Sequence, residues 1–111
     1  MSFQIDIADE STWSSEIMET PGTVQVVEGY QSWCGPCKAV QSAFKRLYFD
    51  LGDRPLKFYT VKADRVQALA SHKGKCRPVF FFYKDGQVLE TVEGVDAPRL
   101  TKLIMDLSAA A

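Results

Sequence analysis

Residues 23–51 read TVQVVEGYQSWCGPCKAVQSAFKRLYFDL, and this stretch decides how the chain folds. Its first part, residues 23–30, is rich in valine and predicts a strand. Residues from about 34 to 51 predict an amphipathic helix, because apolar side chains recur there every three or four positions, at Val40, Phe44, Leu47 and Leu51. Two cysteines, Cys34 and Cys37, therefore lie where a strand passes into a helix.

This placement suits Cys34 and Cys37 to thiol–disulfide exchange. A thiol at a helix N-terminus meets unpaired N–H groups and the positive end of the helix dipole, which favour the thiolate and lower its pKa from about 8.5. We therefore expect Cys34 to be the nucleophile. Cys37 follows one turn deeper on the same helix face, where it can attack the mixed disulfide that Cys34 forms. Its burial is expected to keep it protonated until then.

The same cysteine spacing also occurs in zinc sites, which is the alternative interpretation. A closed structural zinc site needs four ligands, and beyond the pair the chain offers only Cys76 and His72. His72 lies in a basic loop without an acidic or cysteine partner nearby in sequence, so we expect it to be solvated. The sequence predicts no metal and no cofactor.

The rest of the chain alternates between expected strands and helices. The expected strands are residues 4–7, 56–61, 79–83 and 87–92, and the expected helices are residues 9–18, 66–71 and 97–107. Lys84-Asp85-Gly86 predicts a hairpin between the last two strands. Alternation that ends in a hairpin and a helix predicts an α/β fold with a central mixed sheet and helices on both faces.

Composition bounds the classes of function. The 111 residues are 46% hydrophobic, which suffices for one core, so we expect a single domain over residues 1–111. Lysine and arginine number 13 against 14 aspartates and glutamates, and this balance gives no support to nucleic-acid binding. The start lacks the pattern of a signal peptide and no apolar run is long enough to span a bilayer. We expect a soluble cytoplasmic protein with no membrane partner.

These motifs together resemble the thioredoxin family. Trp33 to Lys38 read WCGPCK, which is the family's active-site signature, and Arg77-Pro78 falls where the family has its cis-proline. The resemblance implies the thioredoxin fold, dithiol/disulfide exchange on protein disulfides and no cofactor. It also implies a substrate-binding surface, whose expected residues are Trp33, Gly35, Pro36, Arg77, Pro78 and Gly94. For Pro78, an ordinary proline before a strand is the alternative.

Two further residues gain a role from this resemblance. Glu28 stands where the family carries a buried aspartate that accepts the proton of the resolving cysteine, here Cys37. An acid within an apolar strand is costly to bury without a partner or a raised pKa, so an exposed acid on the strand face is the alternative. Cys76 matches a cysteine of some animal thioredoxins and is a candidate regulatory thiol, with a buried or idle thiol as the alternative.

Several positions depart from common thioredoxins. Ser42, Tyr30 and Val79 replace a proline, a tryptophan and a threonine that are frequent in the family. Residues 30–38, 62–65 and 74–78 are similar to its ciliary branch, which includes thioredoxin-like light chains of axonemal outer-arm dynein. This resemblance implies a dynein heavy or intermediate chain as partner and a location in the axoneme of a cilium or flagellum. A free cytosolic disulfide reductase is the alternative function.

Overall fold

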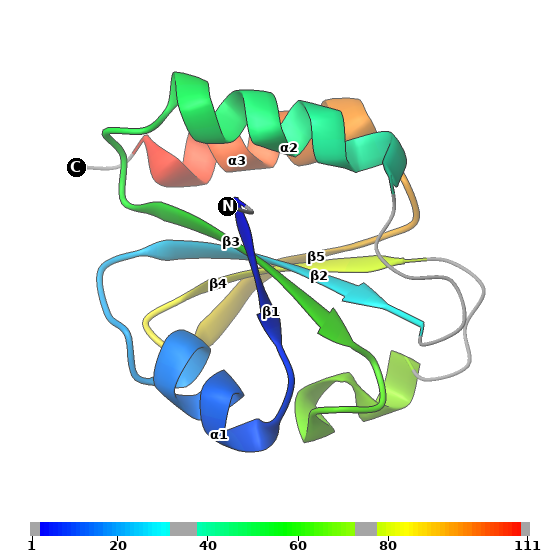
Figure 1. The fold of residues 1–111 in the computed structure, drawn as a ribbon. Helices are drawn as coiled ribbons and strands as arrows, with labels where there is room; N and C mark the ends of the chain where they lie inside the picture. The colour runs from blue at the N-terminus through cyan, green and yellow to red at the C-terminus, as the bar shows by residue number, and fades with distance from the viewer. Residues whose placement is uncertain (1–2, 32–37, 73–77, 110–111) are drawn as a thin grey trace.

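A mixed sheet with helices on both faces forms the part of the chain that the computed structural model describes, residues 3–31, 38–72 and 78–109 (Figure 1). The strands are β1 (Gln4–Ile7), β2 (Val24–Tyr30), β3 (Leu56–Lys62), β4 (Val79–Lys84) and β5 (Gln87–Glu93). The helical segments are α1 (Glu10–Trp13), a π-helical continuation (Ser14–Met18), α2 (Lys38–Asp50), a 3-10 segment (Gln67–His72) and α3 (Ala97–Ser108). The predicted elements are therefore confirmed where the structure describes them.

The described sheet has the strand order β1-β3-β2-β4-β5. β1, β3 and β2 run parallel, whereas β4 is antiparallel to β2 and β5 is antiparallel to β4. In this register Glu28 lies opposite Thr60 of β3 on one side and Phe80 of β4 on the other. The predicted mixed sheet is confirmed, and β2 is its central strand.

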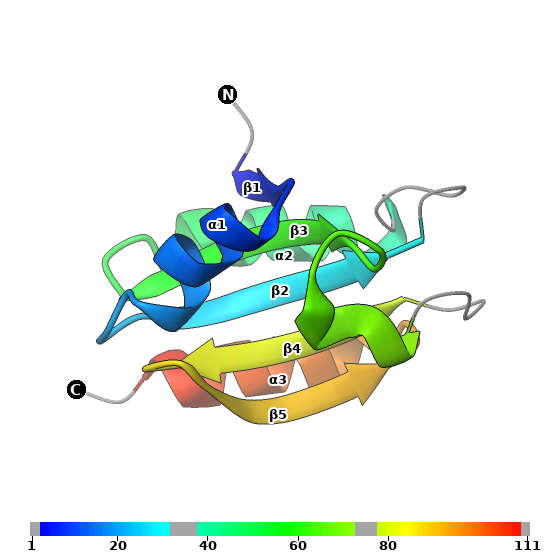
Figure 2. The same ribbon diagram turned by 90° about the horizontal axis from the view of Figure 1, so that it is seen from below.

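Helices cover the two faces of the sheet separately. α2 and α3 lie on one face, and α1 with the 3-10 segment lies on the other (Figures 1 and 2). Each face carries its own apolar core: Val26, Phe44 and Phe80 belong to the first, and Val27 and Leu69 to the second. Because both faces are covered, every residue of β2 is buried. A buried strand of this kind is typically a continuous apolar run, which makes a charged residue within it conspicuous.

Local signals in the sequence set the ends of several elements. The Asp9 side chain accepts a hydrogen bond from the Thr12 amide at 2.8 Å and caps α1, and Asp96 accepts from the Arg99 amide at 3.2 Å and caps α3. Asp85 has φ 54° in the hairpin between β4 and β5, and the following glycine has φ 77°. These positive values suit a tight hairpin turn.

Two structural findings qualify the sequence-based expectations. The expected helix over residues 9–18 changes from α-helical to π-helical geometry at Ser14, and the expected helix over residues 66–71 is a 3-10 segment. The expected start of the long helix at Cys34 lies outside the described residues, which resume at Lys38. Within the described ranges, the chain has no helix long and apolar enough to cross a membrane.

Candidate functional site

The ends of β2 and α2 flank the segment that carries the predicted redox cysteines. β2 ends at Tyr30 and α2 is described from Lys38, and residues 32–37 between them lie outside the described residues. The predicted site residues that fall outside the described ranges are Trp33, Cys34, Gly35, Pro36, Cys37, Cys76 and Arg77. Their predicted roles stay predictions, and the structure describes what surrounds them.

Pro78 and Gly94 are brought together. The Gly94 amide donates to the Pro78 carbonyl at 2.8 Å, which joins the start of β4 to the end of β5. Gly94 has φ 87°, a conformation that favours glycine. The pairing of these two predicted site residues therefore depends on a backbone shape that another residue would adopt only with strain. Substrate binding by Pro78 stays a prediction.

Gly29 lets two elements approach β2 closely beside the predicted site. A Cβ at this position would lie 2.5 Å from Leu69 Cδ2 and 3.0 Å from Val79 Cγ1. Such distances leave no space for a side chain, so the 3-10 segment and the start of β4 are held against the end of β2. The 3-10 segment and β4, which come before and after residues 73–77 in the sequence, therefore both pack closely against β2.

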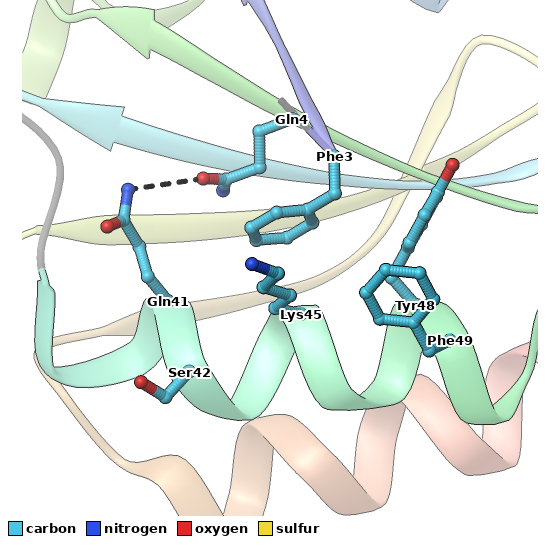
Figure 3. A pocket seen from close by; sticks show the side chains of 7 residues that line it. All are labelled: Phe3, Gln4, Gln41, Ser42, Lys45, Tyr48 and Phe49. Atoms are coloured by element: carbon cyan, nitrogen blue, oxygen red, sulfur yellow. Dashed lines mark hydrogen bonds between the residues drawn. The ribbon is translucent and has the colours of Figure 1, made fainter. Parts of the chain in front are cut away.

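Glu28 is fully buried, with 0% of its surface exposed. This observation excludes the alternative of an exposed acid on a strand face. Gln4 of β1, itself only 8% exposed, donates from Nε2 to Glu28 Oε1 at 3.5 Å. Gln41 of α2 donates in turn from Nε2 to Gln4 Oε1 at 3.4 Å (Figure 3). Residues from one edge strand, one central strand and one helix thus form a single polar chain.

A second polar cluster lies on the same sheet face. Asp6 of β1 is exposed, and its Oδ1 accepts from Thr60 Oγ1 at 2.9 Å and from the Tyr30 hydroxyl at 3.2 Å. Desolvation, with a further contribution from the Asp6 carboxylate, raises the pKa of Tyr30 to about 12. Tyr30 therefore keeps its proton and acts as a donor at neutral pH. These bonds tie together the three parallel strands.

Sequence reasoning missed Gln4, Gln41, Asp6 and Thr60 as parts of these clusters. Alternation in β1 favours inward-facing isoleucines. Ile7 is buried in this way, but Ile5 is 43% exposed and Gln4 is buried as well. The available signal was a glutamine in a short strand expected at the sheet edge, which α2 covers in the folded chain.

Metal binding is tested only within the described residues. There, no group of three histidine, cysteine, aspartate or glutamate side chains lies close enough together to hold a metal ion. Cys34, Cys37 and Cys76 are outside these ranges, so the expectation of a metal-free site stays a prediction.

Comparison with known proteins gives a match to one family model and two groups of relatives, a dynein light chain and a longer protein that contains a thioredoxin domain. A thioredoxin family model matches residues 4–106. A flagellar outer-arm dynein 14 kDa light chain of Chlamydomonas reinhardtii is 58% identical over 108 residues, which is 97% of this chain and 84% of that protein. Human thioredoxin domain-containing protein 6 is 39% identical over 106 residues, 96% of this chain but 32% of the longer protein.

A solved structure supports the architecture. The thioredoxin of Fasciola hepatica superimposes with a TM-score of 0.74 at 24% identity, covering 93% of this chain and 98% of the other. Agreement at this level of identity concerns the fold alone. With the mixed sheet described above, it confirms the expected thioredoxin fold.

Proposed function

Because the chain belongs to the thioredoxin family, we propose that it is a thiol–disulfide oxidoreductase that works by dithiol/disulfide exchange through Cys34 and Cys37. The observation that carries the proposal is the complete burial of Glu28 in β2, the strand that leads directly to the cysteine segment. An acid with no exposed surface is costly to a core, so its presence there favours a chemical role over a structural one.

The first proposed step is attack by the Cys34 thiolate on one sulfur of a protein disulfide. The substrate disulfide breaks, a mixed disulfide forms between Cys34 and the substrate, and the other substrate sulfur leaves as a thiolate that takes a proton from water. The substrate strand is proposed to lie as an extended peptide against the expected binding residues Trp33, Gly35, Pro36, Arg77, Pro78 and Gly94.

The second proposed step resolves this intermediate. The Glu28 carboxylate accepts the proton of Cys37, and the Cys37 thiolate attacks the sulfur of Cys34. The mixed disulfide breaks, the second substrate sulfur leaves as a thiolate, and a Cys34–Cys37 disulfide remains. Two electrons have then passed from the chain to the substrate, and a separate dithiol donor must restore the reduced pair.

Trapping of the mixed disulfide tests the assignment of the two thiols. Cys34→Ser is expected to abolish reduction of a model protein disulfide. Cys37→Ser should still attack and then accumulate as a covalent complex, because no resolving thiol remains. Mass spectrometry under non-reducing conditions measures that complex. Accumulation in Cys34→Ser instead of Cys37→Ser would reverse the two roles.

We further propose that the chain acts as a light chain of an axonemal outer-arm dynein in a cilium or flagellum. Support comes from 58% identity to the Chlamydomonas light chain across nearly all of this chain and most of that protein. The proposed partner is a dynein heavy or intermediate chain. A free cytosolic disulfide reductase is the second candidate, supported by the family match alone.

Extraction from the native source separates the two candidates. A light chain bound without a covalent link should co-sediment with outer-arm dynein, and the double variant Cys34→Ser with Cys37→Ser should stay incorporated. Loss of the double variant from the complex would indicate a disulfide-linked subunit. Recovery of the protein only as a free monomer would favour the reductase.

A further inference from the structure

The buried Glu28 carboxyl is reached by an ordered series of side-chain amides. Gln41 lies half-buried on α2, Gln4 is nearly buried on β1, and Glu28 is fully buried on β2. The two hydrogen bonds of the series, 3.4 and 3.5 Å long, point the same way, from Gln41 to Gln4 and from Gln4 to Glu28. Figure 3 shows the outer part, with the Gln41 amide directed from α2 toward Gln4.

The direction of this series is the one that a charged Glu28 requires. A carboxylate only accepts hydrogen bonds, so the amide of Gln4 must turn its NH₂ group toward Glu28. That orientation presents the Gln4 oxygen to α2, where the Gln41 NH₂ group meets it. Gln41 therefore fixes the amide orientation that a charged Glu28 needs. If Gln4 turned over, an amide oxygen would face the carboxylate oxygen.

We propose that Gln4 and Gln41 are positioning residues for Glu28, which hold its side chain in place and favour its charged, proton-accepting form. The catalytic significance of this proposal rests on the proposed function, in which Glu28 takes the proton of Cys37. The two glutamines are not equivalent in this series of hydrogen bonds. Gln4 contacts the Glu28 carboxyl, whereas Gln41 contacts only Gln4 and acts through it. Removal of Gln4 should therefore have the larger effect.

Access from solvent supports the assignment of Gln41 as the outer member. A hollow of about 530 Å³ between β1 and α2 is lined by both glutamines and by Lys45, among other residues (Figure 3). Water can reach the outer amide there, whereas Glu28 itself has no exposed surface. The glutamines thus connect a solvent-accessible hollow with a buried acid, and they do so without placing a second charge in the core.

Other charged groups around Glu28 are distributed over several elements. Asp6 of β1 and Tyr30 of β2 share its sheet face, and Lys62 ends β3 two residues beyond Thr60. Lys38 and Lys45 lie on α2, while β4 presents Phe80 opposite Glu28. In general, a nearby negative charge disfavours the charged form of a carboxyl group and a nearby positive charge favours it. A test must therefore distinguish the effect of the two amides on Glu28 from the effect of these charges.

Titration of the Glu28 carboxyl by NMR in full-length, ¹³C-glutamate-labelled protein provides that test, with the signal assigned from Glu28→Gln. The cysteine pair is kept oxidised, so the result does not depend on redox activity. Gln4→Met, which keeps side-chain length and removes the amide, should raise the titration midpoint of Glu28 by about one pH unit. Gln41→Met should raise it by a smaller amount.

Thr60→Val is the matched control, since it removes a buried polar group that lies opposite Glu28 but bonds to Asp6. In Thr60→Val, the titration midpoint of Glu28 should stay unchanged or fall slightly. An unchanged midpoint in both glutamine variants would overturn the proposal. If Gln4→Met does not fold, the half-buried Gln41→Met decides alone: a raised midpoint supports the amide chain and an unchanged one refutes it. Failure of the proposed redox function would leave these midpoints as they are.

Discussion

The acids of the two polar clusters, Asp6 and Glu28, differ in their burial and in the length of the hydrogen bonds that they accept. Asp6 is exposed and accepts bonds of 2.9 and 3.2 Å from Thr60 and Tyr30. Glu28 has no exposed surface, and the bond it accepts from Gln4 is 3.5 Å long, against a usual value of about 2.9 Å. The solvated acid is held firmly and suits a structural role. The buried acid accepts a bond from the Gln4 amide in a site without solvent exposure, which suits a group that changes its protonation state.

The largest expected effect is a chemical one at the buried acid. Glu28→Gln keeps the shape of the side chain and removes its ability to accept a proton, so the resolving step should slow about 100-fold. Initial attack by Cys34 should change little, because the proposed role of Glu28 is confined to Cys37. Rapid-mixing measurements of mixed-disulfide formation and decay separate the two steps. Equal slowing of mixed-disulfide formation and decay would show that Glu28 does not act on the resolving step alone, and the contrast with the Asp6 cluster would be lost.

The cluster around Asp6 should respond in stability rather than in rate. Tyr30→Phe removes the hydroxyl that donates to Asp6 and is expected to lower the free energy of unfolding by about 1 kcal/mol. Urea denaturation measures this change. The resolving rate should stay within a few-fold of the wild type. A fall in the resolving rate as large as that caused by Glu28→Gln would show that both clusters contribute to the chemistry.

The third expected effect concerns the dependence of stability on alkaline pH. Folding raises the pKa of Tyr30 to about 12 from an ordinary value of 10, chiefly by desolvation. Its contribution to stability is therefore complete below about pH 10 and is lost as the pH rises toward 12. Tyr30→Phe should lose less stability than the wild type between pH 9 and 11.5. Tyr59→Phe is the parallel variant on the other face of the sheet. Desolvation raises the pKa of Tyr59 to about 12 as well, so its alkaline loss of stability can be compared with that of Tyr30.

Much of the fold could be predicted because its signals are local. The valine-rich strand and the hairpin at Asp85 lie within a residue of their predicted positions, and the helix with a repeating apolar face ends one residue before its predicted end. The capping roles of Asp9 and Asp96 also follow from short sequence spacings. Each of these features depends on neighbours in the chain.

The polar clusters could not be predicted because their partners are distant in sequence. Gln4 and Glu28 are separated by 24 positions, and Gln41 follows Gln4 by 37. A short strand that reads Gln-Ile-Asp-Ile indicates a polar outer face, and only the packing of α2 over β1 turns Gln4 inward. The burial of Glu28 likewise depends on helices covering both sheet faces.

The central claim is that the buried Glu28 accepts the proton of Cys37, and the pH profile of the resolving step tests it most directly. In the wild type, the resolving rate should rise with the ionisation that NMR assigns to the Glu28 carboxyl. In Glu28→Gln, this part of the profile should disappear while the profile of the Cys34 attack stays unchanged. A resolving rate that keeps the wild-type pH profile in Glu28→Gln would contradict the claim.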